Sequence, residues 1–328
     1  MLRRASRRSS YVYCLSQMNV LVVTNMYPTE AEPWFGAFVR DQVDDLRRRG
    51  LPIDVYSFDG RRQKRAYARA AVQIRRRADR GDFDLIHAHY GLSGAVALTQ
   101  RRLPVVTTFH GSETGYIRWQ WVISLAVARM SVPIFVSAQG AASVRCPLAA
   151  VIPVGVDTEL FQPRDRDVVR GSLGWDTGTP HVLFPGARAN RRKRVDLFDA
   201  AIDELERRGT PVRRVYLEGF TRREAADVIA SSDAVLMTSD WEGSPLAVRE
   251  ALASNVPVVS VEVGDVRDVL DGLPACAVTD RDPQILADAL AVALAAPRDE
   301  RLRERALETS RELIAERVES LYRQVVIR

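Results

Sequence analysis

Short runs of apolar, mostly β-branched residues alternate along the chain with longer stretches whose apolar residues recur at helical spacing. This alternation is typical of a parallel β-sheet with helices on both faces. In the first half, the runs that predict strands are NVLVVT (19–24), PIDVYSF (52–58), DLIHAHY (84–90), PVVTTFHG (104–111), PIFVSA (133–138) and AVIPVGVD (150–157). In the second half they are HVLFPG (181–186), RVYLEG (214–219), AVLMTS (234–239) and PVVSVEVG (257–264). The pattern predicts an α/β protein with two series of strands.

The character of the sequence changes between residues 151 and 180, which we interpret as a crossing between domains. We expect residues 18–155 to form one doubly wound, Rossmann-type domain and residues 156–179 to form the crossing. Residues 180–328 would form a second such domain that includes charged terminal helices. Residues 1–17 are set aside as an extension, either disordered or read from a misassigned start. Two facing domains predict one cleft, because such sheets bind ligands beyond the carboxyl ends of their strands.

Charge and cysteine content narrow the classes of partner. The chain has a formal net charge of +5, of which the segment before Met18 supplies four positive charges, so the remainder carries 5 − 4 = +1. A nearly neutral body gives no reason to propose nucleic acid as a partner. The three cysteines are scattered without metal-ligand or redox spacing, which predicts a reducing cytoplasm. No apolar run approaches the roughly 18 residues of a spanning helix.

Two loops of the first half carry candidate residues. Gly36 precedes the helical stretch VRDQVDDLRRRG, where a glycine lets a phosphate approach free helix N–H groups; the alternative is an ordinary turn glycine. His110 ends a strand, where a histidine is as often structural as functional. His87 and His89 alternate along another strand, and we expect only one of them to face a given side. No metal site is expected, because no carboxylates converge with these histidines at ligand spacing.

The stretch FPGARANRRKRVDLF (184–198) follows a predicted strand and enters a helix. Cations beside free helix N–H groups predict a pyrophosphate pocket. The chain has only two lysines, Lys64 and Lys193, against 47 − 2 = 45 arginines. A lysine is a compact point charge that suits a phosphate, whereas an arginine is a planar fork. Lys193 is therefore a candidate, with the chance placement of one lysine as the alternative.

The stretch WEGSPLAVREAL (241–252) carries two glutamates around a predicted helix start. Ser244 is predicted to be the N-cap, Pro245 the first helical residue, and Asn255 the end. Eight helical residues rise about 12 Å, so Glu242 and Glu250 can reach opposite ends of one ligand. The helix N-terminus between them would face phosphate or hydroxyl groups. The alternative is a surface helix with ordinary carboxylates.

Together these motifs resemble those of one family. The segment DWEGSPLAVREALASNVPVVSVEVGDV, with two glutamates separated by seven residues, resembles the signature of retaining GT-B glycosyltransferases of the family-four type. TFHGSE, DLIHAHYGLSG, IPVGVDTELF and the Gly36 loop agree with that family in order and spacing over nearly the whole chain from Met18. EGSP followed by ALASNVPVVSVEVGDVRD is most similar to the teichuronic-acid-type glycosyltransferases. The resemblance implies a GT-B-like fold of two facing Rossmann-type domains.

The resemblance also implies how a donor would be held in the second domain. Glu250 would hydrogen-bond the ribose of a nucleotide. Glu242, with backbone N–H groups of the segment formed by the next four residues, would hold the hydroxyls of the donor sugar; Pro245 in that segment has no N–H to donate. Those four donor-binding residues are Gly243, Ser244, Pro245 and Leu246.

Further implied roles concern the phosphates and the reacting carbon. Arg188 and Lys193 would bind the pyrophosphate, with Arg191 as the alternative to Arg188 under a shifted alignment. Gly36 would lie against the phosphate, and His110 would contact the donor sugar near the reacting carbon. Members of the family need no metal, because cations and helix ends stabilise the leaving diphosphate. The resemblance therefore implies no cofactor.

The implied activity is sugar transfer from a nucleotide-diphosphate donor to a hydroxyl acceptor with retention, the acceptor lying on the first domain. The relatives suggest a lipid-linked or polysaccharide-precursor acceptor. One alternative is a nucleotide-sugar epimerase or hydrolase on the same fold; another is a catalytically idle subunit that binds nucleotide sugar for a partner transferase. Asp82–Asp84 has the form of a metal-binding pair of another transferase class, but we interpret it as a turn and strand start.

The basic stretch GRRQKRAYARAAVQIRRRADRGD (60–82) suggests where the enzyme works. If it is helical, Tyr67, Ala70, Ala71 and Ile74 form one apolar stripe among arginines. Such a helix can lie on an anionic bilayer, which would place the enzyme at the inner face of the membrane. The alternative is a solvated helix whose stripe packs on the sheet.

Overall fold

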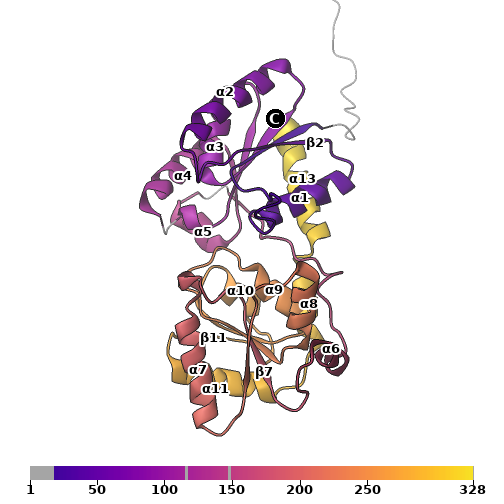
Figure 1. Ribbon diagram of the computed structural model, residues 1–328. Coiled ribbons are helices and arrows are strands. Elements are labelled where there is room, and N and C mark those ends of the chain that lie inside the picture. The colour runs from indigo at the N-terminus through magenta and orange to yellow at the C-terminus, as the bar shows by residue number, and fades with distance from the viewer. Residues whose placement is uncertain (1–17, 115–116, 147–148, 328) are drawn as a thin grey trace, which may run out of the picture.

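The fold consists of two α/β domains joined by two crossings of the chain (Figure 1). The structure is a computed structural model that describes residues 18–114, 117–146 and 149–327. The predicted extension, residues 1–17, lies outside the described residues.

The first domain is built on a parallel sheet with strand order β2-β1-β3-β4-β5-β6. Its strands are β1 (Val20–Thr24), β2 (Ile53–Ser57), β3 (Leu85–His89), β4 (Val105–Phe109), β5 (Val132–Phe135) and β6 (Ala150–Val151). The helices between them are α1 (Ala37–Arg48), α2 (Arg65–Arg80), α3 (Gly91–Ala97), η1 (Ser112–Thr114), α4 (Arg118–Met130) and α5 (Ala138–Ser143). Strands β1, β3 and β4 are buried throughout, which explains their continuous apolar runs.

The second domain is built on a parallel sheet with strand order β11-β10-β9-β7-β8. Its strands are β7 (His181–Phe184), β8 (Arg213–Tyr216), β9 (Ala234–Met237), β10 (Val258–Val261) and β11 (Ala277–Thr279). Its helices are α6 (Arg166–Leu173), η2 (Arg191–Lys193), α7 (Val195–Arg207), α8 (Arg222–Ser231), α9 (Leu246–Ala253), α10 (Val266–Leu270), α11 (Pro283–Ala295) and α12 (Glu300–Leu307). The ten predicted strands are present. β11 was not predicted, because three half-buried edge residues give no periodic signal.

The last helix, α13 (Arg311–Ile327), returns to the first domain. Figure 1 shows it in yellow beside α1, and its residues Ile314, Val318 and Tyr322 are buried in the core formed by the first sheet. We expected the terminal helices to belong to the second domain, but α13 packs on the first. Helical periodicity identifies an apolar face but not the sheet that covers it.

The apolar stripe of α2 packs inward. Ala70 and Ile74 are buried beneath the helix, and Tyr67 and Ala71 pack against the same core of the first sheet. The hypothesis that this stripe inserts into a bilayer is therefore wrong, and the alternative of packing on the sheet holds. No helix in the described part of the chain is long and apolar enough to cross a membrane.

Candidate active site

Loops from the two domains are in direct contact through their backbone atoms. The loop after β4 places His110 and Gly111 against Gly243, which follows β9 in the second domain. A Cβ atom at Gly243 would lie 2.1 Å from the His110 carbonyl oxygen, and one at Gly111 would lie 2.5 Å from the Gly243 Cα. Gly264, after β10, approaches the Gly243 carbonyl oxygen from the other side, where its own Cβ would lie at 2.6 Å. The domains therefore touch at a point that only glycines permit.

Glu242 is held by two cations from the loop after β7. Its Oε1 lies 2.8 Å from the Lys193 Nζ, and its Oε2 lies 2.8 Å from the Arg192 Nη1. Burial acts to raise the pKa of Glu242, but the attraction of Lys193 and then Arg192 lowers it below its ordinary value. Arg192 also lies over the Trp241 ring at 4.5 Å. The carboxylate is thus charged, fixed and directed at the candidate phosphate-binding loop.

Arg188 lies at the edge of this arrangement. Its Nε contacts the Glu218 Oε1 at 2.6 Å, its guanidinium lies over the Tyr216 ring, and 60% of its side chain is exposed. Arg191 is exposed, and within the described residues its side chain makes no ion pair. The structure brings Lys193 to Glu242 and leaves Arg188 on Glu218.

Glu250 lies one turn from the end of α9 and is almost fully buried. Burial raises its pKa to about 7, and the Arg222 guanidinium, 4.0 Å away, acts in the opposite direction. Arg222 also contacts the Asp41 Oδ2 at 3.0 Å, and Asp41 lies on α1 of the first domain. A buried carboxylate in this state is poised to accept hydrogen bonds from ligand hydroxyls.

The N-terminus of α9 has no side-chain cap. The prediction that Ser244 caps it is wrong: the helix begins at Leu246 with Pro245 as N-cap, and the Ser244 hydroxyl donates to the Asp265 Oδ2 at 3.0 Å. Arg249, 2% exposed, binds the same carboxylate at 2.6 Å. The Asp265 carboxylate thus anchors the loop from outside, and the first N–H groups of α9 remain free for an anion.

His110 belongs to a column of buried polar rings. His87 and His89 face the same side of β3, with ring centroids 4.2 Å apart, so the expectation that only one of them faces a given side is wrong. Residues two apart in a strand share a face. The Nδ1 of His89 lies 3.2 Å from the His110 Nε2, and the His87 ring nitrogens contact Tyr322 and Thr108 at 2.5 and 2.7 Å.

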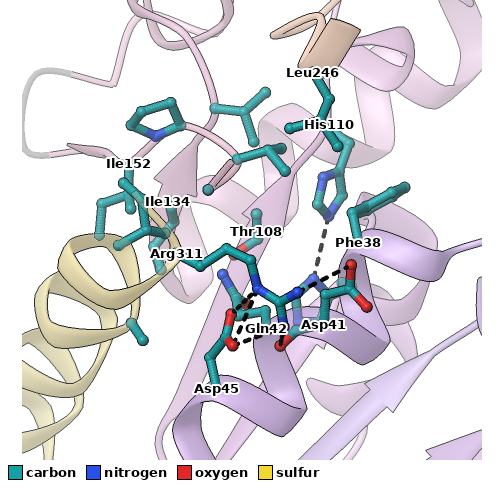
Figure 2. Close-up of a pocket in the computed structure, with 17 residues that line it drawn as sticks. Phe38, Asp41, Gln42, Asp45, Thr108, His110, Ile134, Ile152, Leu246 and Arg311 are labelled. Carbon is teal, nitrogen blue, oxygen red and sulfur yellow. Dashed lines mark hydrogen bonds and ion pairs between the residues drawn. The ribbon is translucent and has the colours of Figure 1, made fainter. Parts of the chain in front are cut away.

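A small cavity lies between His89 and His110 of this column and the first residues of α13. Figure 2 shows His110 between Phe38 and Leu246, with Arg311 reaching across to Asp45. The cavity measures about 30 Å³, enough for one or two water molecules and far too small for a nucleotide sugar.

Gly36 is the N-cap of α1, with a φ of 73°. A Cβ there would lie 2.5 Å from the carbonyl carbon of Met26, because the loop after β1 folds back beneath the helix start. The glycine is therefore required by the loop itself, which agrees with the alternative of a turn glycine.

Among the described residues, no group of three or more His, Cys, Asp or Glu side chains has a geometry that could hold a metal ion. Asp84 Oδ2 accepts a hydrogen bond from the Asn19 backbone N–H at 2.8 Å, which is a role in starting the strand.

Several contact residues were missed by sequence reasoning. Arg192 adjoins Lys193 and carried the same signal. Asp265, in the GDV motif after β10, and Arg222, at the start of α8, have partners that are distant in the sequence and gave no local signal. His89 was noted only as a strand histidine.

The fold and the site define a glycosyltransferase of the GT-B type. A model for glycosyltransferase family 4 matches residues 14–160, and a model for group 1 glycosyl transferases matches residues 179–296. The chain belongs to glycosyltransferase family 4, whose members retain the anomeric configuration and need no metal. The predicted family and class of reaction are confirmed, and the predicted GT-B fold is confirmed with them.

Similar proteins span both domains. MMP alpha-(1->4)-mannosyltransferase of Mycolicibacterium hassiacum is 28% identical over 76% of this chain and 72% of its own. The putative teichuronic acid biosynthesis glycosyltransferase TuaC of Bacillus subtilis is 24% identical over 83% and 88%. Among solved structures, the sucrose-phosphate synthase of Thermosynechococcus elongatus superposes with a TM-score of 0.79 at 19% identity, covering 95% of this chain and 99% of that one. Anabaena HepE, solved with UDP, gives a TM-score of 0.69 at 16% identity, covering 94% and 100%.

Proposed function

We propose that this enzyme transfers a sugar from a uridine diphosphate sugar, bound between His110 and α9, to a hydroxyl acceptor on the first domain. The observation that carries the proposal is the Lys193–Glu242 pair at 2.8 Å, beside the uncapped start of α9 and opposite His110. The UDP and UDP-glucose complexes of HepE, which shares the fold, support a uridine donor.

Each donor-site residue then has a distinct role. Glu250 accepts hydrogen bonds from the ribose, and Glu242 with the α9 N–H groups holds the sugar hydroxyls. Lys193 and Arg188 neutralise the pyrophosphate. To do so, Arg188 leaves its ion pair with Glu218 and binds the ligand instead. Glu242 keeps Arg192 as a partner when Lys193 turns to phosphate.

The remaining contacts act on the phosphate and the reacting carbon. The N-terminus of α1 at Gly36 faces the phosphate, and His110 contacts the sugar. As the bond to the diphosphate lengthens, the acceptor hydroxyl attacks from the same face, and its proton passes to the departing phosphate oxygen. Fixed cations and helix N–H groups stabilise the charge that develops on the leaving group.

The domain division carries the roles of the two substrates. In this proposal residues 180–310 bind the donor and residues 18–155, with α13, take the acceptor. The acceptor is a lipid-linked or polysaccharide-precursor hydroxyl. Because α2 exposes Arg65, Arg69 and Arg76 but no apolar stripe, contact with an anionic membrane rests on charge alone. Membrane contact is supported if the protein pellets with phosphatidylglycerol vesicles but not with neutral ones, and if pelleting is lost when these three arginines are replaced by serine. Equal pelleting with both kinds of vesicle would refute membrane contact.

A thermal-shift screen in EDTA tests the donor proposal. UDP, UDP-glucose, GDP and GDP-mannose are compared on the wild type and on Lys193→Ala. A ligand at a hundredfold excess over its Kd stabilises by roughly 2.7 kcal/mol. Stabilisation by uridine nucleotides in the wild type alone supports the proposal. Stabilisation by guanosine nucleotides only, or a requirement for manganese, would overturn the donor assignment.

A further inference from the structure

His89 and His110 are linked through their ring nitrogens. His110 is held at its backbone by Glu113, whose Oε1 accepts from the His110 N–H at 2.7 Å, and Phe38 packs on its ring at 4.8 Å between centroids. The only side-chain hydrogen bond to the His110 ring among the described residues is the 3.2 Å contact of its Nε2 with the His89 Nδ1 (dashed below His110 in Figure 2). The Nδ1 of His110 is therefore the ring atom left for a substrate.

Both rings are neutral at working pH. Burial lowers the pKa of His110 to about 3 and that of His89 well below its ordinary value. Two neutral imidazoles share one proton across an Nδ1–Nε2 contact, so the tautomer of one ring dictates that of the other.

The surroundings of His89 select one arrangement. Its Nε2 is buried and has no hydrogen-bond partner among the described residues. A buried N–H without a partner is costlier and rarer than a buried lone pair without one. The proton of His89 therefore belongs on Nδ1, where His110 accepts it.

We infer that His89 is a positioning residue that fixes His110 in the tautomer with its proton on Nδ1, so that His110 presents a neutral N–H donor to the sugar. The inference deepens the proposed function and rests on it for the sugar contact, but not for the tautomer. His89 is 1% exposed, so it acts through His110.

The neighbouring rings make the position of His89 firm. The His87 ring packs against it with the centroids 4.2 Å apart and the planes tilted by 40°, and His87 is itself held by Tyr322 of α13 and Thr108 of β4. Because His87 is held in place, it limits the movement of the His89 ring, and the Nδ1 of His89 can therefore orient the ring of His110.

The test combines a spectrum with kinetics. The chain has 4 histidines, so long-range ¹⁵N–¹H spectra of the labelled enzyme resolve each ring and report which nitrogen carries the proton. The wild type is expected to show His110 protonated on Nδ1 alone. His89→Leu should show a mixture of tautomers, and His89→Asn, whose amide can replace the Nδ1–H, should restore the wild-type signal.

The kinetic expectation separates positioning from folding. His89→Leu should lower kcat about tenfold, the effect of one lost hydrogen bond, while the donor Kd stays within about twofold. His89→Asn should recover most of kcat. His181→Leu is the matched control, because it removes an equally buried imidazole from β7, and it should leave kcat unchanged.

Two results would overturn the inference. One is a His110 tautomer that is the same in the wild type and in His89→Leu. The other is a wild type with His110 protonated on Nε2. Both are read without substrate, so they stand even if no nucleotide sugar binds, which would refute only the proposed function.

Discussion

Gly243 in the second domain and His110 in the first lie so close that a Cβ on Gly243 would sit 2.1 Å from the His110 carbonyl oxygen. The contact joins the loop that precedes α9 to the loop that follows β4, and it fixes how far the two domains can close. Since the neighbouring cavity has room for only one or two water molecules, we expect a sugar bound between His110 and α9 to require the domains further apart.

Gly243→Ala should block closure without damaging either domain. The φ of Gly243 lies outside the left-handed region, so alanine is tolerated wherever the domains are apart. We expect a larger radius of gyration by small-angle scattering and a loss of turnover of about 10²-fold, since misplacement by an ångström costs that much. Gly171→Ala on α6, with open space around it, is the control and should change neither quantity. A normal radius with normal turnover would show that this contact is not part of the working state.

The ionisation of Glu250 should make donor binding depend on pH. In the free enzyme, burial raises the pKa of Glu250 to about 7, so its carboxyl group carries a proton below that pH. The ionised carboxylate is the better acceptor of hydrogen bonds from the ribose hydroxyls. Binding favours the ionised form, so the donor Kd should fall as pH rises from 6 to 8 and level off above. The proton that Glu250 releases when the donor binds would be detected by isothermal titration calorimetry in two buffers of different ionisation enthalpy.

Glu250→Gln identifies the group responsible. Burial also raises the pKa of Glu113 to about 7, so the wild-type profile alone cannot distinguish the two carboxyls. Glu250→Gln should bind the donor more weakly, by roughly 1.5–3 kcal/mol, and with a flat profile. A profile that keeps its slope in Glu250→Gln and loses it in Glu113→Gln would assign the titration to Glu113.

Lys193→Ala should reduce kcat/KM about 10²–10³-fold, the usual cost of removing one group that stabilises a developing anion. Glu242 retains its contact with Arg192 at 2.8 Å, so the fold should survive, as judged by an unchanged thermal midpoint. Lys64→Ala removes the only other lysine and should have wild-type kinetics. Wild-type turnover of Lys193→Ala at saturating donor would remove Lys193 from the phosphate site.

The buried Arg249–Asp265 pair should matter for stability more than its neighbour Ser244. Asp265→Asn leaves the Arg249 charge buried without its counterion, and we expect a loss of about 3–5 kcal/mol in urea unfolding. The double variant Arg249→Met with Asp265→Leu should recover much of that loss, since apolar replacement of a buried pair is often neutral. Ser244→Ala should keep stability but weaken donor binding severalfold. Equal losses in the single and double variants would mean that the pair does not couple.

The sequence by itself determined the two series of parallel strands and the residue types at their carboxyl ends. Continuous apolar runs such as NVLVVT can only be satisfied by burial on both faces. Lys193 and Glu242 follow such runs at helix entrances, and Glu250 lies within the helix that Glu242 precedes. The family signature added the class of reaction. These are local properties, in which neighbours along the chain are neighbours in space.

Only the tertiary structure decided which of these groups meet. Ser244 has the side chain of an N-cap, but Asp265, brought from the next strand, takes its hydroxyl and leaves α9 open. The apolar face of α13 packs against the first sheet, and Arg311 at the start of this helix binds Asp45 on α1 at 2.7 Å. His89 becomes a partner of His110 because β3 and β4 are adjacent, a pairing set by sheet order. Periodicity specifies which face of an element is buried, whereas the partner on that face is chosen by packing between segments far apart in the chain.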